Sequence, residues 1–322
     1  MKHFKQIAIL AGSIALFSSC ASTNKSKTDE PAVCKEVISV RNEMPSLLPA
    51  NKQFKLVWND EFNGNTLDES KWCYRTCFWG RRARWFAEPK DNAVEVKDGK
   101  VYLKIVKKED GQFVTPLLQT GHLIWDYIHD NKDSFWPISK VEKPIFLHRY
   151  GFYECRCRTQ QMPGWWSAFW MQSEMQGTTS DPAYAGIEHD IMECFSPGTI
   201  IPSCFHYGGC GADHVQFTSP RIKGNMDEVS TKIAKEEFHV YGMLWEPDGY
   251  TLYLDGKPRG PKIGMEKSEA VSQVPEFILI STEGHNFRQN NCTGSASAEL
   301  VKAYEAGDAF IVDYVRVYDI VE

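Results

Sequence analysis

Short runs in which apolar and polar residues alternate recur along the chain, and they constrain its fold more than any other feature. Clear examples are residues 100–106, 151–158, 250–254 and 310–318. A period of two indicates β-strands that bury one face. Long helical periodicity is absent, and residues 227–238 give the only modest helical candidate. The sequence therefore predicts an all-β protein.

Asp-Gly pairs supply the tight turns that such strands need. They occupy positions 98–99, 110–111, 248–249 and 255–256, and several flank the alternating runs. Asp and Gly tolerate the left-handed backbone of two-residue hairpin turns, so these pairs predict antiparallel hairpins. Neither an internal repeat nor a change of composition follows residue 53, and we therefore expect one domain over residues 51–322.

The first fifty residues have a different character. Positively charged residues precede an apolar run over 7–17 that ends in Ser18-Ser19-Cys20, which predicts a signal peptide over residues 1–20. The run is too short to span a membrane. Small residues before a cysteine are similar to a bacterial lipobox, which would make Cys20 a lipid anchor to the membrane, and ordinary cleavage that leaves a plain thiol is the alternative. Residues 21–50, rich in Ser, Thr, Lys, Pro and Asn, would then form a flexible tether.

Such an anchor would place the protein in the bacterial cell envelope, on a periplasmic or surface face. The balance of 36 Lys and Arg against 42 Asp and Glu gives a formal charge of -6, which argues against a nucleic-acid partner. We expect a monomer. The 10 Trp, 13 Tyr and 18 Phe supply rings for a core and equally for stacking on sugars or bases.

Of the ten cysteines, nine follow Cys20, and we expect most of them to be buried as small apolar residues. Cys204, His206, Cys210 and His214 have a spacing similar to that of zinc ligands. It matches no common zinc module, however, and the glycines at 208–209 indicate a turn within a strand. We therefore expect no zinc site there.

The densest group of acids lies in residues 186–195, between β-prone apolar flanks. On a strand, Glu188 and Asp190 point to one face, whereas Glu193 points to the other unless an extra residue shifts the phase. A β-bulge at Ile191-Met192 would place all three carboxyls on one face. Crowded carboxylates raise each other's pKa, so such a patch requires a reason.

Two readings of this patch remain open from the residues alone. Retaining glycosidases use two carboxyls about 5 to 5.5 Å apart, one as nucleophile and one as acid and base. The middle acid could share a proton with one neighbour and so keep the other neutral. A solvated acidic edge strand, or a calcium site built from oxygens, is the alternative.

The segment Glu188-His189-Asp190-Ile191-Met192-Glu193 resembles the bulged E-x-D-x-x-E catalytic strand of glycoside hydrolase family 16, which includes laminarinases, lichenases, agarases, porphyranases and carrageenases. Further segments resemble the family in the right order, from about residue 54 to 318: 56–62 with 67–72, 150–156, 163–170, 238–248 with 253–256, and 312–318. The resemblance implies a β-jelly roll, a concanavalin A-like sandwich of two curved antiparallel sheets with an open concave cleft. It further implies Glu188 as nucleophile, Glu193 as general acid and base, and Asp190 as the residue that orients the pair, without a cofactor for catalysis.

The same resemblance suggests substrate-binding residues. Trp166 resembles the family's cleft tryptophan, and Trp170 lies on the same face of the expected strand, whereas Trp165 and Phe169 face the core. His206 lies in a His-Tyr-Gly-Gly segment like that of laminarinases, where contact with substrate or Glu193 and simple packing are both open. His189 points away from the acids and is expected to be a hydrogen-bonded core residue.

Arginines and aromatic residues alternate over residues 79–86, which loosely resemble a segment that reaches the cleft in galactan-cleaving members. Arg84 and Trp85 are therefore candidates for binding sulfate or uronate groups, with solvated surface as the alternative. Family members often hold a structural calcium on the convex face, and Glu61, Gly99 and Asp313 occupy the similar places.

The sequence thus predicts a retaining endo-β-glycosidase acting on internal β-1,3 or β-1,4 linkages of a polysaccharide. A β-glucan, a β-galactan that carries sulfate, and a host glycan all remain open. The alternative is a catalytically silent surface lipoprotein that binds glycans, although a binding module has no need of three crowded carboxyls.

Overall fold

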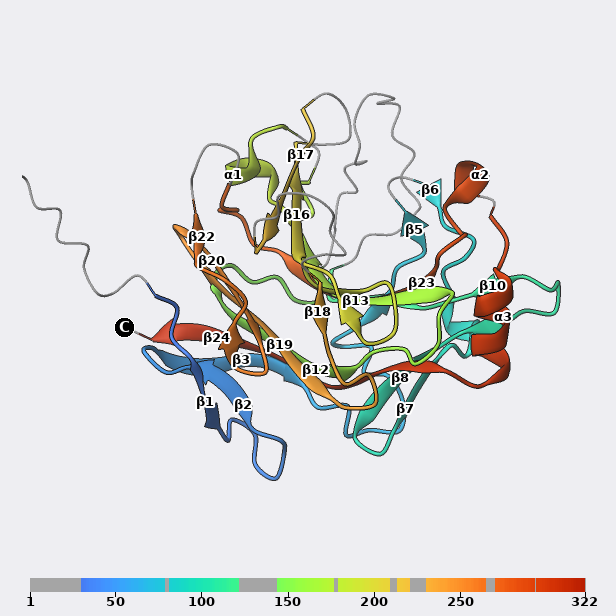
Figure 1. The fold of residues 1–322 in the computed structure, drawn as a ribbon, viewed down its shortest axis with the longest axis horizontal. Coiled ribbons are helices and arrows are strands. Elements are labelled where there is room, and N and C mark those ends of the chain that lie inside the picture. Colours follow the sequence, from blue (N-terminus) through green and yellow to red (C-terminus); the bar gives the residue numbers. More distant parts are fainter. Residues whose placement is uncertain are drawn as a thin grey trace, which may run out of the picture. The chain divides into compact units, whose positions relative to one another are not determined.

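Two large antiparallel sheets hold most of the strands (Figure 1). The structure, a computed structural model, describes residues 30–78, 81–121, 144–176, 179–208, 213–220, 230–264, 270–292 and 294–321. Every pairing between strands in these ranges is antiparallel. The fold class that the alternating pattern predicted is confirmed.

The first of the two, sheet A, contains seven strands within the described ranges. Their spatial order is β17 (Val215–Ser219), β16 (Ser203–Tyr207), β14 (Glu188–Cys194), β13 (Trp165–Gln172), β23 (Phe277–Gly284), β11 (Leu117–Gln119) and β4 (Cys73–Tyr74). Strands β13 and β14 lie near its middle, flanked by β23 and β16. Each therefore has a paired neighbour on both sides, which fixes the direction of its side chains.

The second, sheet B, contains nine strands of the described chain. Their order is β21 (Lys257–Pro258), β20 (Gly249–Leu254), β19 (His239–Glu246), β12 (Gly151–Arg158), β24 (Ala309–Val321), β8 (Lys100–Lys104) and β7 (Val94–Lys97), with β22 (Ile263–Gly264) on β20 and β3 (Gln53–Asp60) on β24. Two of the predicted Asp-Gly pairs turn tight hairpins at its edges. Asp98 and Gly99, and likewise Asp255 and Gly256, all have positive φ angles, as such turns require.

Shorter elements connect the sheets. The paired short strands are β1 (Cys34–Val37) with β2 (Ser46–Pro49), β5 (Cys77–Phe78) with β6 (Arg81–Arg82), β9 (Val106–Lys107) with β10 (Phe113–Val114), and β15 (Thr199–Ile200) with β18 (Thr231–Lys232). The helices are η1 (Pro89–Asp91), α1 (Pro182–Ala185), α2 (Gln289–Cys292) and α3 (Ala298–Glu305). The helical candidate at 227–238 is wrong over residues 230–238, where β18 and turns lie, whereas α3 was not predicted.

The main core lies between the two sheets. Sheet A contributes Phe169, Met192 and Ile280, and sheet B contributes Tyr153 and Met243, all without solvent exposure. The strands are therefore apolar on the faces that meet, and burial of these faces is the main force that holds the sandwich together. The prediction that cysteines serve as buried apolar residues is confirmed for Cys155, Cys157, Cys194 and Cys204.

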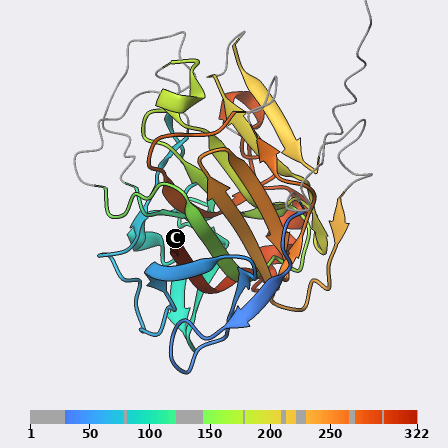
Figure 2. The same cartoon turned by 90° about the vertical axis from the view of Figure 1, so that its left-hand side faces the viewer.

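The predicted tether does not extend to residue 50. Strands β1 and β2 form a hairpin, blue in Figures 1 and 2, that packs on sheet B on its side away from sheet A. Leu48 is buried against Phe152 and Leu244 of sheet B. The backbone N–H of Leu47 donates to Glu154 at 2.6 Å, and Arg316 donates to the carbonyl of Met44 at 2.8 Å. The hairpin therefore belongs to the folded body, and Pro31 to Glu322 form one unit.

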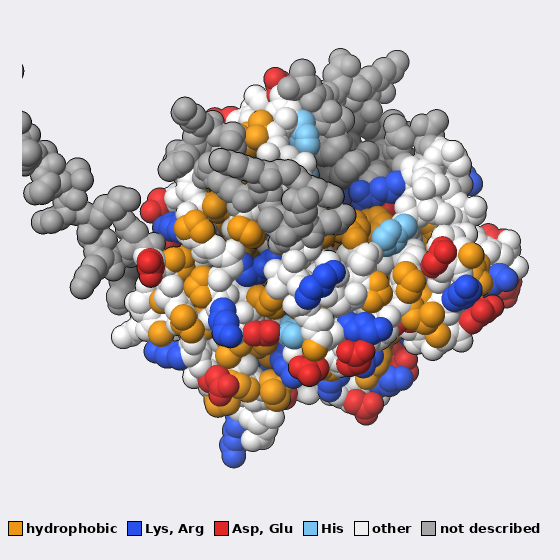
Figure 3. All heavy atoms as spheres, viewed as in Figure 1, with side chains coloured by type: hydrophobic (Ala, Val, Ile, Leu, Met, Phe, Trp, Pro, Cys, Tyr) orange, Lys and Arg blue, Asp and Glu red, His pale blue; other side chains and the backbone are white. Residues whose placement is uncertain are grey.

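The signal peptide, Cys20 and the start of the tether lie outside the described residues. Helices in the described ranges are all too short or too polar to cross a bilayer. On the face seen in Figure 3, acidic and basic side chains are interspersed among the coloured residues. This distribution agrees with the modest net charge of -6.

Candidate active site

Strand β14 carries the three acids and contains the predicted irregularity. Phe169 of β13 pairs with Met192. The next residue, Trp170, pairs with Asp190, so that Ile191 has no partner on β13. Two residues on one strand facing a single step on the other is the pattern of a β-bulge. The bulge lies where the spacing of the acids predicted it.

The bulge brings the three carboxyls to one face. Glu193 pairs with Ala168, and Asp190 pairs with Trp170. Ala168 and Trp170 are two residues apart and therefore point to the same side of β13, as do their partners. Glu188 lies two residues before Asp190 and shares that side. We call it the outer face of sheet A, because it is opposite the core between the sheets.

His189, between the first two acids, confirms the direction of the strand. Its side chain is fully buried in the inner core, where Nδ1 lies 2.6 Å from Oε2 of Glu276. The rings of Trp245 and Tyr250 from sheet B pack against it. The prediction of a hydrogen-bonded core histidine is confirmed, and its neighbours must face outward.

The three acids are nearly buried and perturb one another. Glu188 and Asp190 are 9% and 7% exposed, and Glu193 is partly exposed. Burial raises the pKa of Glu193 to about 7, and the nearby charge of Glu188 adds to this effect. Burial, Glu193 and Glu188 together hold the pKa of Asp190 well above its ordinary value. The group therefore retains protons at neutral pH, which is what a general acid needs.

One arginine on the same face partly offsets the raised pKa values of the three acids. Arg288 donates two hydrogen bonds to Glu283, at 2.7 and 2.8 Å, and its guanidinium carbon lies 5.1 Å from the ring centre of Trp166. Its positive charge lowers the pKa of all three acids, against the effect of burial. Since Glu283 already balances this charge, the acids are compensated only in part.

A buried arginine reaches the first acid through an amide. Arg75, 2% exposed, donates to Oε1 of Gln172 at 2.7 Å. The amide nitrogen of Gln172 in turn donates to Oε2 of Glu188 at 3.2 Å. Because Arg75 can only donate, it orients the amide so that its N–H group faces the carboxylate. Burial raises the pKa of Glu188, and Arg75 is the largest influence that lowers it.

Sequence reasoning did not identify four residues of this site, namely Arg75, Gln172, Glu283 and Arg288. They lie at scattered positions in the chain and outside the acidic motif. For Gln172, one signal existed: it lies two residues after Trp170 and so continues the outward-facing row of β13.

His206 lies beside Asp190 rather than Glu193. On β16 it pairs with Glu188, and its Nε2 lies 3.5 Å from Oδ2 of Asp190. Its Nδ1 lies 3.1 Å from Nε2 of His214. Burial, with a smaller effect of His214, lowers the pKa of His206 to about 4, so the ring is neutral near pH 7.

The predicted binding residues differ in how they are placed. Trp166 shares the outer face with Ala168 and contacts the rings of Phe195 and His285. Trp170 is partly exposed on the same face, and its indole N–H donates to Ser281 at 2.9 Å. Both tryptophans therefore lie on the face of sheet A that carries the three acids.

Arg84 and Trp85 do not form a joint binding surface. Arg84 is exposed, but Trp85 is 4% exposed and packs in a second core cluster with Phe86 and Ile105. The ring therefore has no open face for a sugar. The interleaved pattern of 79–86 did not show which aromatic residues point inward.

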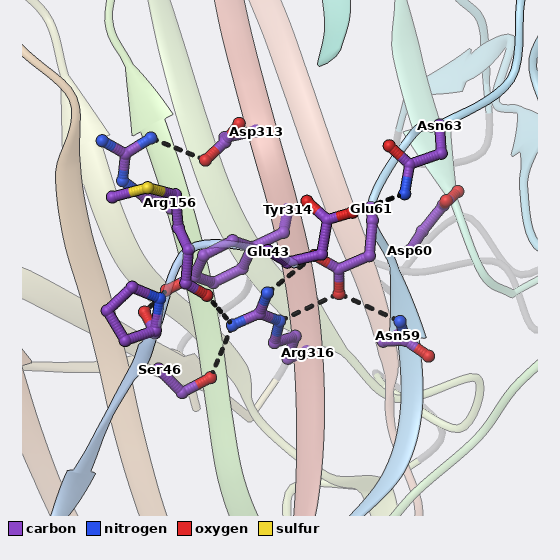
Figure 4. Close-up of polar contacts among 12 residues, drawn as sticks. Glu43, Ser46, Asn59, Asp60, Glu61, Asn63, Arg156, Asp313, Tyr314 and Arg316 are labelled. Carbon is purple, nitrogen blue, oxygen red and sulfur yellow. Dashed lines mark hydrogen bonds and ion pairs between the residues drawn. The ribbon is translucent and has the colours of Figure 1, made fainter. Parts of the chain in front are cut away.

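The two predicted calcium ligands that carry carboxylates, Glu61 and Asp313, are engaged by cations of the chain itself (Figure 4). Both carboxylate oxygens of Glu61 accept hydrogen bonds from Arg316, at 2.9 and 2.7 Å. Asp313 accepts from Arg156 at 2.6 Å, and Lys100 lies 3.7 Å away. Glu61 lines a cavity of about 390 Å³ whose lining includes neither Gly99 nor Asp313. These side chains therefore do not fit the predicted calcium site.

Comparison with known proteins identifies the wider group. Residues 55–320 match the family model described as β-porphyranase A–D, GH16 domain. The chain is 27% identical over 224 residues to glucan endo-1,3-β-glucosidase A1 of Niallia circulans, covering 65% of this chain and 29% of that protein. It is 25% identical over 287 residues to β-porphyranase D of Zobellia galactanivorans, covering 82% and 60%. The chain thus spans less than two thirds of either relative.

The fold has close counterparts among solved structures. The endo-β-1,3-glucanase of Pyrococcus furiosus superposes with a TM-score of 0.55 at 20% identity, over 85% of this chain and 97% of that one. This similarity shows the fold, which is a β-jelly roll. The matched family model covers most of the chain and includes the bulged acidic strand and its neighbours. The chain belongs to glycoside hydrolase family 16.

Proposed function

We propose that this protein is a retaining endo-β-glycosidase that hydrolyses internal β-linkages of a polysaccharide. The observation that carries the proposal is the register shift at Ile191, which puts Glu188, Asp190 and Glu193 on one face of sheet A. Retaining glycosidases need two carboxyls about 5 to 5.5 Å apart that flank the sugar linkage. A solvated acidic edge strand is a poor description of β14, since it is paired on both sides and its acids are largely buried.

The two glutamates would divide the work. Glu188, oriented by the amide of Gln172, attacks the anomeric carbon while Glu193 protonates the departing sugar oxygen. A glycosyl ester on Glu188 forms, and the leaving sugar takes the proton. Glu193, now ionised, deprotonates a water molecule that breaks the ester, so the configuration is retained. A raised pKa suits Glu193 for the first step.

Asp190 would hold the pair in the required charge state. It lies between the two glutamates, and their charges raise its pKa well above the ordinary value. Asp190 therefore keeps a proton that it can donate to either neighbour in a hydrogen bond. When Glu188 loses its charge in the ester, the pKa of Asp190 falls and Asp190 can release its proton to water. The negative charge of Asp190 then raises the pKa of Glu193 and so helps Glu193 to take a proton from the attacking water.

The polymer is proposed only as a class. The two relatives described above are named for a β-1,3-glucan and for porphyran. Trp170, partly exposed on the outer face, offers its ring to the apolar face of either kind of sugar, whereas Trp166 is only 8% exposed and has Arg288 over its ring. We therefore propose that the substrate is a β-glucan or a β-galactan, and this proposal includes sulfated galactans and host glycans. Lipid attachment through Cys20, and thereby a place in the bacterial cell envelope, is likewise our proposal from the leader-like segment.

A panel assay tests this function. The protein lacking residues 1–20 is incubated with laminarin, mixed-linkage glucan, agarose, porphyran, carrageenan and mucin, and products are separated by size. We expect a ladder of oligosaccharides from one polymer class, as internal cleavage requires. Release of monosaccharides alone, without longer oligosaccharides, would contradict internal cleavage. Binding to one polymer without products would favour the silent glycan-binding lipoprotein instead.

A further inference from the structure

Three different metal-binding groups meet beside the catalytic strand. Strand β16 pairs with β14 so that Cys204 lies directly opposite Asp190 and His206 directly opposite Glu188. One ligand atom from each of Asp190, Cys204 and His206 lies within 4.8 Å of the others. Cys204 and His206 are close in the sequence, whereas Asp190 comes from the neighbouring strand and is brought to them only by the fold.

The chemistry of this group is selective. It offers a carboxylate oxygen, a thiol sulfur and an imidazole nitrogen, a mixture that suits Zn²⁺ and similar ions, whereas Ca²⁺ and Mg²⁺ prefer oxygen alone. Ligand bonds of about 2.1 Å at a tetrahedral angle place neighbouring ligand atoms roughly 3.4 Å apart. The 3.5 Å between Nε2 of His206 and Oδ2 of Asp190 matches this spacing. The sulfur of Cys204 would need to move toward Asp190 and His206 to complete the set of three ligands.

Neighbouring side chains support the ligands. His214 lies 3.1 Å from Nδ1 of His206, and the two rings are stacked. When His206 carries its proton on Nδ1, that N–H donates a hydrogen bond to His214. Nε2 of His206 then has the lone pair that a metal needs. Gln216, on β17, donates from its amide to the sulfur of Cys204 at 3.6 Å. Burial and the nearby acids raise the pKa of the Cys204 thiol well above its ordinary value, and this contact opposes that rise only in part.

We propose that Asp190, Cys204 and His206 bind one thiophilic divalent cation, with Zn²⁺ as the representative ion, and that its binding stops glycan hydrolysis. The thiol proton of Cys204 and the proton held by Asp190 both leave to solvent as the metal–sulfur and metal–oxygen bonds form. The metal holds Asp190 and so removes it from between Glu188 and Glu193. The binding stands on geometry alone, whereas the inhibition rests on the proposed function.

Cobalt is the probe for the binding. The full chain is titrated with Co²⁺, whose thiolate bond gives a charge-transfer absorption in the near ultraviolet and whose tetrahedral sites absorb strongly in the visible. We expect one equivalent to produce both signals and one equivalent of Zn²⁺ to remove them. Cys204→Ser should abolish the charge-transfer signal and weaken Zn²⁺ binding by about tenfold or more. Cys34→Ser, which changes a half-buried thiol of the β1–β2 hairpin, should keep both.

Several results would overturn the site. One is a wild-type protein that binds Co²⁺ without the thiolate signal. Another is a signal that survives in Cys204→Ser but disappears in Cys210→Ser. Should Cys204→Ser fail to fold by circular dichroism, His206→Gln serves instead, and unchanged Co²⁺ spectra in that variant would equally reject the assignment.

A second set of measurements tests the inhibition. Hydrolysis is followed with and without Zn²⁺, and each variant is compared with its own zinc-free rate. We expect Zn²⁺ at saturation to reduce the wild-type rate at least about tenfold and Cys204→Ser to lose that sensitivity. Zinc that binds as described without slowing the wild type would refute the inhibition. If no polymer is cleaved by any form while the cobalt signals appear, the proposed function fails and the metal site stands.

Discussion

Two sets of buried carboxyls, one on each sheet, differ in how their charge is balanced. On sheet B and its neighbouring loop, Glu61 and Asp313 are each held by an arginine at 2.6 to 2.9 Å. On sheet A, the acids of β14 have chiefly one another, with Arg75 and Arg288 bonded to other partners. A balanced acid holds structure together, whereas an unbalanced one keeps a raised pKa that is available for chemistry.

The same substitution in each set tests this difference most directly. Glu188→Gln should leave the fold intact and lower kcat about 10⁴-fold or more, because the amide cannot form the glycosyl ester. Glu61→Gln should instead reduce the free energy of unfolding and leave kcat within about twofold. Initial rates and urea denaturation of both variants check this. Substantial activity in Glu188→Gln would refute its role as nucleophile.

Removal of the balancing cation is the next largest effect. Arg316→Met leaves the buried carboxylate of Glu61 unpaired and should lower the free energy of unfolding by about 3–5 kcal/mol. Arg156→Met is the matched control on the same sheet and should cost less, because Arg156 is 19% exposed and Arg316 is fully buried. Urea denaturation measures both. Equal losses in the two variants would contradict the importance that we give to burial.

On β14, in contrast, removal of an ionisable carboxyl should stabilise the folded protein at high pH. In the folded protein the pKa of Glu193 is raised from 4.5 to about 7, so the folded state holds a proton that the unfolded chain has already released in that window. Stability contributed by this group is therefore present below pH 4.5 and lost as the pH rises to 7. Glu193→Gln has no such loss and should be more stable than the wild type at pH 8 by about 1–2 kcal/mol.

Denaturation at pH 4 and pH 8 measures this difference. The gain should be absent at pH 4, where both proteins carry a neutral side chain. Asp313→Asn is the control from the balanced set and should be destabilising at pH 8. A Glu193→Gln variant that is less stable than the wild type at pH 8 would contradict the account of the unbalanced acids.

The smallest expected effect concerns the two hydrogen bonds that link Arg75 through Gln172 to Glu188, which we call the relay. Arg75 lowers the pKa of that carboxyl, so Arg75→Gln should raise it. The nucleophile must be ionised, and the acidic limb of kcat/KM should therefore move to higher pH, by about half to one unit. Arg156→Gln makes the same change away from the site and should leave the limb in place. A shift to lower pH in Arg75→Gln would show that the relay does not act on Glu188.

Local patterns predicted part of this structure well. The phase mismatch between Asp190 and Glu193 sufficed to predict the bulge, since side-chain direction along one strand depends on counting residues. Alternation and Asp-Gly pairs predicted the antiparallel sheets. Helix α3 was missed because it has only eight residues, although Ser297 caps its start by accepting from the N–H of Leu300.

Long-range pairings could not be predicted in the same way. Arg75 lies more than a hundred residues before Glu188, and nothing local links the two. Trp85 was a candidate for substrate binding through a loose resemblance of residues 79–86, and the interleaved arginines and aromatic residues do not show which rings face the core. The resemblance that suggested calcium ligands does not reveal that Arg316 pairs with Glu61 and Arg156 with Asp313, although Arg316 lies only three residues after Asp313.

Azide rescue tests most directly whether Glu188 and Glu193 act from opposite sides of one linkage. Glu188→Ala and Glu193→Ala are each assayed on an activated aryl β-glycoside with added azide, a small nucleophile that can occupy the space of a missing carboxylate. We predict that Glu188→Ala yields a glycosyl azide of inverted configuration and that Glu193→Ala yields one of retained configuration, as proton NMR will show. Azide products of the same configuration from both variants would contradict the division of roles.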